Sequence, residues 1–196
     1  MIKVLLVDDH TAVRAGLGAL LRLEPGFVST GAAGSAAEAV EAARRARPDV
    51  VIADYHLMDG DGLSLCRTLK HMDPAPAVLV YSAFASGRLA LAALVAGSDG
   101  LLEKGASADE LFDAIRTVAG GRPLPFTAAQ EQFAVGAVAL EPEDLPILGM
   151  RAERTPVAEI AATLRVPLTE VEARIDAMVR RLRPPIEPRV PVGAQL

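Results

Sequence analysis

Four charged side chains stand at the ends of separate apolar runs of the sequence. Asp8 and Asp9 follow IKVLLV, Asp54 follows VVIA, and Lys104 follows GLLE. Short parallel strands end along one edge of a sheet, so residues that are distant in sequence meet there in one crevice. The pattern therefore predicts a site that brings three carboxylates and one ammonium group together.

Three clustered carboxylates repel one another, and this repulsion indicates a bound cation. A small, hard ion such as Mg²⁺, held by one or two carboxylates, water and a phosphate, suits such a group best. One carboxylate can then act as a nucleophile, because phosphoryl transfer needs positioning, a metal and a neutralising cation more than acid or base chemistry. Lys104 can supply that cation, and the constellation predicts a phosphorylation pocket.

Each of these residues has a simpler explanation when it is taken alone. An Asp that follows a strand is often only a helix cap or a loop residue. The order Asp-Asp, Asp, Ser82 and Lys places each residue at the end of a different predicted strand. The combination therefore favours a shared site over a series of unrelated caps.

Composition and charge limit the classes of function. The 196 residues, 51% of them hydrophobic, suit one full domain and a small second one. No apolar run reaches the roughly 18 residues that span a bilayer, and the amino terminus turns acidic where a signal peptide stays apolar, so we expect a cytoplasmic protein without membrane contact. The single cysteine, Cys66, excludes an intramolecular disulfide, and the net charge of −5 gives no general attraction to nucleic acid.

Residues 1–120 alternate short apolar runs with amphipathic stretches. This alternation predicts repeated βα units in an α/β fold with a doubly wound, five-stranded parallel sheet. The expected strands are IKVLLV, FVSTGA, VVIA, AVLVYS and SDGLL, and the expected helices span 11–23, 35–46, 61–71, 86–96 and 107–119.

The remaining chain divides into three parts. Residues 121–139 contain two prolines near their start and predict a linker that carries a short helix. Residues 140–183 have the periodicity of a small all-α domain. The proline-rich residues 184–196 predict a flexible tail.

The opening VDDHTAVRAGL and the spacing of the charged residues resemble the receiver domain of two-component response regulators. The resemblance covers residues 1–120 and implies a flavodoxin-like fold. The opening is similar to the NarL/FixJ subfamily, whose output is a LuxR-type helix-turn-helix. Such a receiver takes a phosphoryl group from a sensor histidine kinase and catalyses only its own phosphorylation and dephosphorylation, so the resemblance implies no enzyme acting on a free substrate.

The resemblance also assigns metal ligands. By position, Asp54 is the phosphoacceptor, and Asp9 and Asp54 bind Mg²⁺ directly. Asp8 acts through water, and the backbone carbonyl of His56 completes the protein ligands. We expect Mg²⁺ to be the cofactor.

The remaining pocket residues include two matches and three departures from the family pattern. Lys104 matches the residue that pairs with the phosphoryl group, and Ser82 the residue that hydrogen-bonds it. Met58 replaces a proline of the phosphoacceptor loop, and His56 is a bulky residue where water reaches the acyl phosphate. Leu101 replaces an aromatic switch residue, which predicts weak coupling to the output.

Residues 140–182 align with a LuxR-type helix-turn-helix. Pro146 and Gly149 weaken its first helix, because a proline about one turn inside costs on the order of 3 kcal/mol, and we expect a short or kinked helix. Arg154 replaces a turn glycine of the family. The apolar frame is kept at Leu140, Ile147, Leu148, Ile160, Ala161, Leu164, Val166, Val171, Ile175 and Leu182.

The third helix of this helix-turn-helix segment is more acidic than a DNA-binding helix is expected to be. Glu172 and Asp176 match DNA-contacting lysines of the family, and Glu170 lies beside them. From residue 141 onward nine acids and eight arginines give no net positive charge, whereas phosphate binding needs a clustered positive face. The candidate DNA contacts are Arg174, Arg180, Arg181 and Arg183.

Two classes of function remain open from the sequence. In the first, a histidine kinase phosphorylates Asp54 and thereby controls a DNA-binding transcriptional output, with a homodimer at least in the phosphorylated state. In the second, the output domain has decayed, and the receiver binds protein or acts as a phosphoryl sink without binding DNA. The apolar frame favours the first, and the acidic third helix favours the second.

Overall fold

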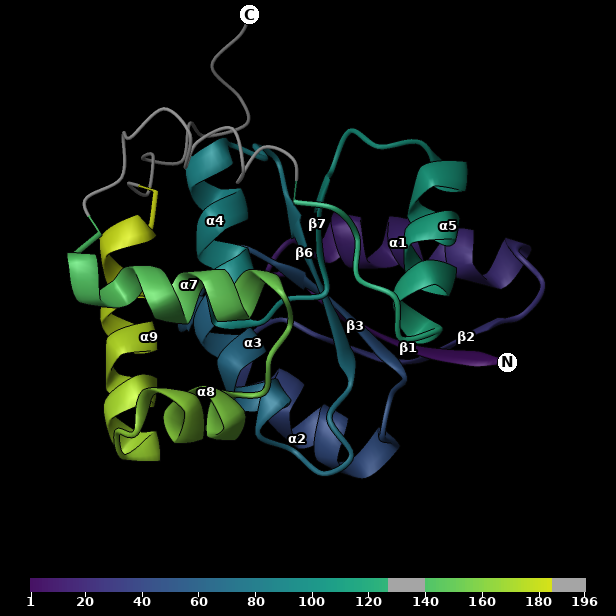
Figure 1. Cartoon of the computed structure of the whole chain (residues 1–196). Helices are drawn as coiled ribbons and strands as arrows, with labels where there is room; N and C mark the ends of the chain where they lie inside the picture. Colours follow the sequence, from purple (N-terminus) through teal and green to yellow (C-terminus); the bar gives the residue numbers. More distant parts are fainter. Residues whose placement is uncertain (127–139, 185–196) are drawn as a thin grey trace, which may run out of the picture.

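The computed structural model describes residues 1–126 and 140–184 (Figure 1). Five parallel strands form a sheet in the order β2-β1-β3-β6-β7. This order is that of the flavodoxin-like doubly wound fold, so the predicted fold class is confirmed. The strands are β1 (Ile2–Val7), β2 (Phe27–Ala33), β3 (Val50–Asp54), β6 (Ala77–Ser82) and β7 (Gly100–Glu103).

Helices cover both faces of the sheet (Figure 1). Buried residues of α1 and α5 pack on one face of the sheet, and buried residues of α2 and α3 pack on the other. The helices are α1 (Thr11–Leu23), α2 (Ala36–Ala46), α3 (Gly62–Lys70), α4 (Gly87–Ala96) and α5 (Ala108–Ala119).

The predicted helices begin one residue early in four cases because the helix-capping residue was counted. Ser35, Asp61, Ser86 and Ser107 each accept a hydrogen bond from a first-turn N–H of the helix that follows. The last strand starts at Gly100, two residues later than predicted. Ser98 is excluded from it because its buried hydroxyl donates to the carbonyl oxygens of Val78 and Gly100.

A small hairpin that the sequence did not predict follows β3. Its strands are β4 (His56–Leu57) and β5 (Gly60–Asp61). Met58 lies exposed at the tip, while the Asp59 carboxylate accepts hydrogen bonds of 2.7 and 3.0 Å from the first two N–H groups of α2. The loop is therefore held to α2 even though Met58 replaces the family's proline.

The C-terminal unit is helical, as predicted. Its first helix is short, as predicted, but Pro146 does not lie one turn inside that helix, as the sequence had suggested. The proline stands in the first turn of that helix, where its missing N–H costs little. Arg154 adopts a left-handed conformation with φ +63°, which explains why glycine suits this turn. The elements are η1 (Pro142–Asp144), α7 (Leu145–Ala152), α8 (Val157–Leu164) and α9 (Leu168–Leu182).

Helix α4 joins the two halves of the chain. All residues from Leu89 to Ala96 are buried, and a helix that is apolar all round must be covered on every side. The sheet covers one side, and α9 and α7 cover the other (Figure 1). The receiver and the C-terminal helices therefore share one apolar core, to which α9 contributes Val171, Ile175, Met178, Val179 and Leu182.

The predicted linker helix and nearly all of the predicted tail lie in 127–139 and 185–196, outside the described residues. Within 1–126 and 140–184, no helix combines the length and the apolar character needed to cross a membrane. Cys66 is buried inside α3.

Candidate functional site

The strand ends bring Asp8, Asp54 and Lys104 into one crevice. Asp8 follows β1, Asp54 ends β3, and Lys104 follows β7. Both carboxylates are buried, with 2% and 3% of their surface exposed. The Lys104 Nζ lies 2.6 Å from the Asp8 Oδ2 and 2.9 Å from the Asp54 Oδ2. The lysine thus bridges two carboxylates that would otherwise repel each other.

Asp9 and His10 complete the cluster. One potential ligand atom from each of Asp8, Asp9, His10 and Asp54 lies within 4.8 Å of the others. The His10 Nδ1 is 2.7 Å from the Asp9 Oδ1 and 3.2 Å from the Asp8 Oδ1. The sequence analysis missed His10, although its place directly after the Asp-Asp pair was an available signal.

The donor set of this crevice fits a small, hard cation. Three carboxylates converge there, and oxygen ligands are those that Mg²⁺ prefers. The backbone N–H of His56 donates a hydrogen bond to Asp54, so the chain turns back over the crevice directly after the strand. Receiver domains bind Mg²⁺ at an acidic pocket of this kind.

Burial and ion pairing act in opposite directions on the pKa values. Burial raises the pKa of Asp54, and the hydrogen bond from Lys104 only partly opposes this effect. Burial alone would lower the pKa of Lys104, but its hydrogen bonds to Asp8 and Asp54 outweigh that cost and raise it. Lys104 therefore keeps its proton and serves as a fixed positive charge.

Ser82 ends β6 and is 3% exposed. Its hydroxyl is 3.3 Å from both the backbone N–H and the carbonyl oxygen of Phe84. Phe84 itself is 72% exposed. The Ser82 hydroxyl is thus engaged with its own loop, and contact with a phosphoryl group requires this loop to rearrange.

Gly62 allows the chain to pass close to Asp54. A Cβ atom there would lie 2.4 Å from the Asp54 carbonyl oxygen, whereas one at Gly60 would meet nothing within 4 Å. We predict that Gly62→Ala lowers the free energy of unfolding by about 1–3 kcal/mol, as overpacking does, and slows phosphorylation. Urea denaturation measures the stability, and Gly60→Ala is the matched control. Equal stability of the two variants contradicts the close approach.

Two acids of α9 that match DNA-contacting positions pair with the receiver. The Asp176 Oδ1 lies 2.5 Å from the Arg67 Nε on α3. The Glu172 Oε1 lies 3.4 Å from the His71 Nε2 at the end of the same helix. The structure thus gives these acids an intramolecular role that the sequence did not reveal.

The four candidate DNA-contacting arginines differ in their surroundings. Arg174 and Arg181 pair with acids of their own unit, among them the buried Asp144. Arg183 lies 2.9 Å from the Asp61 Oδ2, in the loop after Asp54. Arg180 is exposed and forms no ion pair with a described residue.

The end of α9 is also held by groups that the sequence analysis missed. Arg88 on α4 donates hydrogen bonds to the carbonyl oxygens of Arg181 and Leu182, at 2.5 and 3.1 Å. The hydroxyl of Tyr55, next to Asp54, donates to the carbonyl oxygen of Pro184 at 3.4 Å. The end of α9 therefore contacts both α4 and the loop after Asp54.

The chain is similar to known regulators in sequence and in structure. The family described as the response regulator receiver domain matches residues 4–116. The DNA-binding transcriptional activator DevR/DosR of Mycobacterium tuberculosis is 42% identical over 63% of this chain and 57% of that protein. The transcriptional regulatory protein LiaR of Bacillus subtilis is 29% identical over 93% of this chain and 91% of that protein.

A solved structure of a LuxR-family two-component response regulator from Aurantimonas sp. has a TM-score of 0.63 at 30% identity and covers 70% of this chain and 99% of its own. The bridged carboxylates at the strand ends, the β2-β1-β3-β6-β7 sheet and these similarities agree. The chain belongs to the response regulator receiver family and is a two-component response regulator of the LuxR/NarL type.

Proposed function

We propose that a sensor histidine kinase phosphorylates Asp54 and that this event controls transcription through the C-terminal unit. The observation that carries the proposal is the buried crevice in which Lys104 bridges Asp8 and Asp54. Asp9 and Asp54, with the backbone carbonyl of His56, would hold Mg²⁺ directly, and Asp8 would act through water.

In the transfer, a carboxylate oxygen of Asp54 attacks the phosphorus. A new oxygen–phosphorus bond forms, and the bond from phosphorus to the nitrogen of the kinase histidine breaks. Lys104 is already placed to neutralise the growing charge on the phosphoryl oxygens. Bound Mg²⁺ supplies further positive charge at the same oxygens. Ser82 would then leave its contacts with Phe84 and donate to the phosphoryl group.

For the output, we propose DNA binding by the last turns of α9. The intact apolar frame of the helix-turn-helix and the description of DevR/DosR as a DNA-binding activator support this role. Arg180 is exposed, while Arg174, Arg181 and Arg183 are held by acids in the present arrangement. DNA contact by these arginines therefore requires a change in their pairing.

A second candidate function is a receiver whose output acts without DNA. The pairing of Glu172 and Asp176 with α3 favours it, because these positions then serve the fold of this chain. Under this alternative, phosphorylation of Asp54 alters a protein-binding surface or stores phosphoryl groups. A pool of genomic DNA fragments separates the two candidates, since only the first predicts salt-sensitive binding.

Another prediction concerns the oligomeric state of the protein. Leu101 packs against the core around α4 and has no aromatic ring to move when Ser82 moves, and α9 already covers part of α4. We predict that beryllofluoride produces only a partial shift toward dimer, seen by light scattering, and that Leu101→Tyr enlarges the shift. A complete conversion of the wild-type protein to dimer contradicts this prediction.

A further inference from the structure

A cleft of about 580 Å³ opens between the receiver and the C-terminal helices. The end of α3 and the end of α4 line one side, and α7, the start of α8 and the start of α9 line the other. None of Asp8, Asp9, Asp54 and Lys104 lines it. Its volume lies within the range of roughly 300–1,000 Å³ that is typical of small-molecule sites.

The cleft carries an excess of positive charge. Its lining has two carboxylates, those of Asp99 and Glu172, against four permanently basic side chains, with His71 in addition. The four basic side chains are Arg67, Lys70, Arg151 and Arg154.

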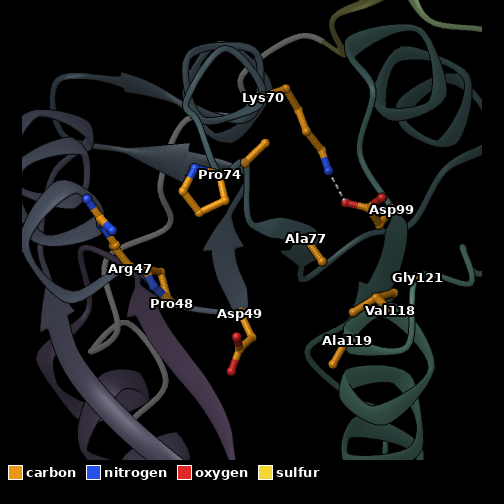
Figure 2. Close-up of a pocket in the computed structure, with 11 residues that line it drawn as sticks. Arg47, Pro48, Asp49, Lys70, Pro74, Ala77, Asp99, Val118, Ala119 and Gly121 are labelled. Atoms are coloured by element: carbon orange, nitrogen blue, oxygen red, sulfur yellow. Dashed lines mark hydrogen bonds and ion pairs between the residues drawn. The ribbon is translucent and has the colours of Figure 1, made fainter.

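Three of these four lie within ion-pair distance of a carboxylate, and Arg154 shares Asp99 with Lys70. Arg67 pairs with Asp176. Lys70 pairs with Asp99 at 2.5 Å, and Figure 2 shows this pair above a smaller hollow of about 360 Å³ on the other side. The Lys70–Asp99 pair therefore lines both hollows. Arg151, near the end of α7, and Arg154, in the turn that follows, line only the larger of the two.

Arg151 and Arg154 each have a donor atom without a hydrogen-bond acceptor among the described residues. The Arg154 Nη1 donates to the Ser98 carbonyl oxygen at 2.8 Å and lies 3.6 Å from Asp99, but its Nη2 is buried without a hydrogen-bond partner among the described residues. The Arg151 Nε is buried in the same way, and Arg151 forms no ion pair with any described residue. Buried polar groups normally have partners, so both guanidinium groups are incompletely paired in this arrangement.

Burial disfavours the charged forms of both arginines, and mutual repulsion adds to this effect at Arg151. Burial, followed by the charge of Arg154, lowers the pKa of Arg151, and burial also lowers the pKa of Arg154. Arg151 cannot easily turn away, because its guanidinium lies against the backbone of Gly97. A guanidinium presents several donors in a fixed plane, which suits phosphate oxygens better than a single point charge does.

The start of α8 lies in the same cleft. Its capping residue is Pro156, which provides no side-chain cap, and Val157 and Ala158 line the cleft. The free N–H groups and the positive end of a helix dipole favour an anion at this place. Leu168 and Val157 add apolar surface for the rest of a ligand.

We propose that this cleft binds a small organic phosphate, with its phosphate group on Arg151, Arg154 and the start of α8. A DNA duplex cannot enter a cleft of this size between two packed units, so the phosphate must belong to a small molecule. The ligand contacts both the receiver and the C-terminal helices. It therefore stabilises the packed arrangement and opposes the release of α9.

Isothermal titration calorimetry with AMP and with inorganic pyrophosphate tests the site in the full chain. EDTA is present, because the carboxylate crevice repels phosphates when no metal is bound. We expect one binding site per chain, and at least a tenfold loss of affinity in Arg151→Gln and in Arg154→Gln. Arg44→Gln is the matched control, since Arg44 is exposed on α2 and, in the part of the chain that the structure describes, pairs with Glu41 alone.

Absence of binding by the wild-type chain overturns the proposal, as does equal affinity of wild type, Arg151→Gln and Arg154→Gln. Circular dichroism melting checks that the variants fold. If Arg151→Gln is unfolded, Arg154→Gln and Arg151→Lys decide the question, the lysine variant retaining charge but losing the planar set of donors. Binding of pyrophosphate without AMP restricts the ligand to compact phosphates and contradicts the role of the apolar wall.

Discussion

Replacing Asp54 with Asn is expected to abolish phosphorylation by acetyl phosphate. The proposed nucleophile is one carboxylate oxygen in a buried crevice, and the amide that replaces it neither attacks phosphorus nor holds the positive charge of Lys104. The loss should be complete within the detection limit of intact-protein mass spectrometry, because no second carboxylate in the cluster matches the family's phosphoacceptor position.

The control for this experiment is Asp113→Asn. Asp113 is an exposed carboxylate on α5 whose one ion pair among the described residues is with Arg116, and four-fifths of its side chain is open to solvent. This variant should label as the wild type does. Undiminished labelling of Asp54→Asn contradicts the assignment of the phosphoacceptor, whereas loss of labelling in Asp113→Asn points to a general defect in folding.

The second large effect is expected when the two receiver-facing acids of α9 become lysines. In Glu172→Lys/Asp176→Lys, positive side chains face Arg67 and His71 on α3, so attraction becomes repulsion. The same change makes the helix more basic by four charges. We expect affinity for DNA at low salt to rise by at least roughly tenfold, with a steeper dependence on salt, because each added phosphate contact releases counterions.

Fluorescence anisotropy with a labelled duplex measures this gain. The matched control, Glu143→Lys/Glu159→Lys, makes the same change of charge at two exposed positions in the same unit that form no ion pair with a described residue of α3. If charge alone determines binding, both variants gain equally, and the ion pairs with α3 have no special role. A gain confined to the α9 variant supports release of α9 from the receiver.

The receiver was predictable because its signals are local. Apolar runs gave the strands, and charged residues at their ends gave the crevice of Asp8, Asp54 and Lys104. Helix starts were displaced by one residue only because a cap such as Ser107 belongs to the helix by chemistry and precedes it by conformation.

Other features had no local signal. The β4–β5 hairpin has strands of two residues, which are too short to show a periodicity. Pro146 was misplaced because a 3-10 turn precedes α7 and shifts the start of the helix. Only the structure shows that a side chain at Gly62 would meet the Asp54 carbonyl oxygen.

The acids of α9 show the limit most clearly. Their mismatch with a DNA-contacting surface is visible in the sequence, but their partners are not, because His71 and Glu172 are 101 residues apart. The same is true of Arg88, which binds the carbonyl end of α9 from α4. Such long-range pairs depend on how the C-terminal helices pack on the receiver, and no periodicity encodes that packing.

The most direct test is a salt titration of DNA binding, with and without beryllofluoride, against a fluorescent pool of genomic DNA fragments. Control of a DNA-binding output by Asp54 predicts that beryllofluoride tightens binding, that binding weakens steeply as salt rises, and that Asp54→Asn removes the effect of beryllofluoride. No binding at low salt, or equal binding in both states, contradicts this control and leaves a receiver whose output acts without DNA.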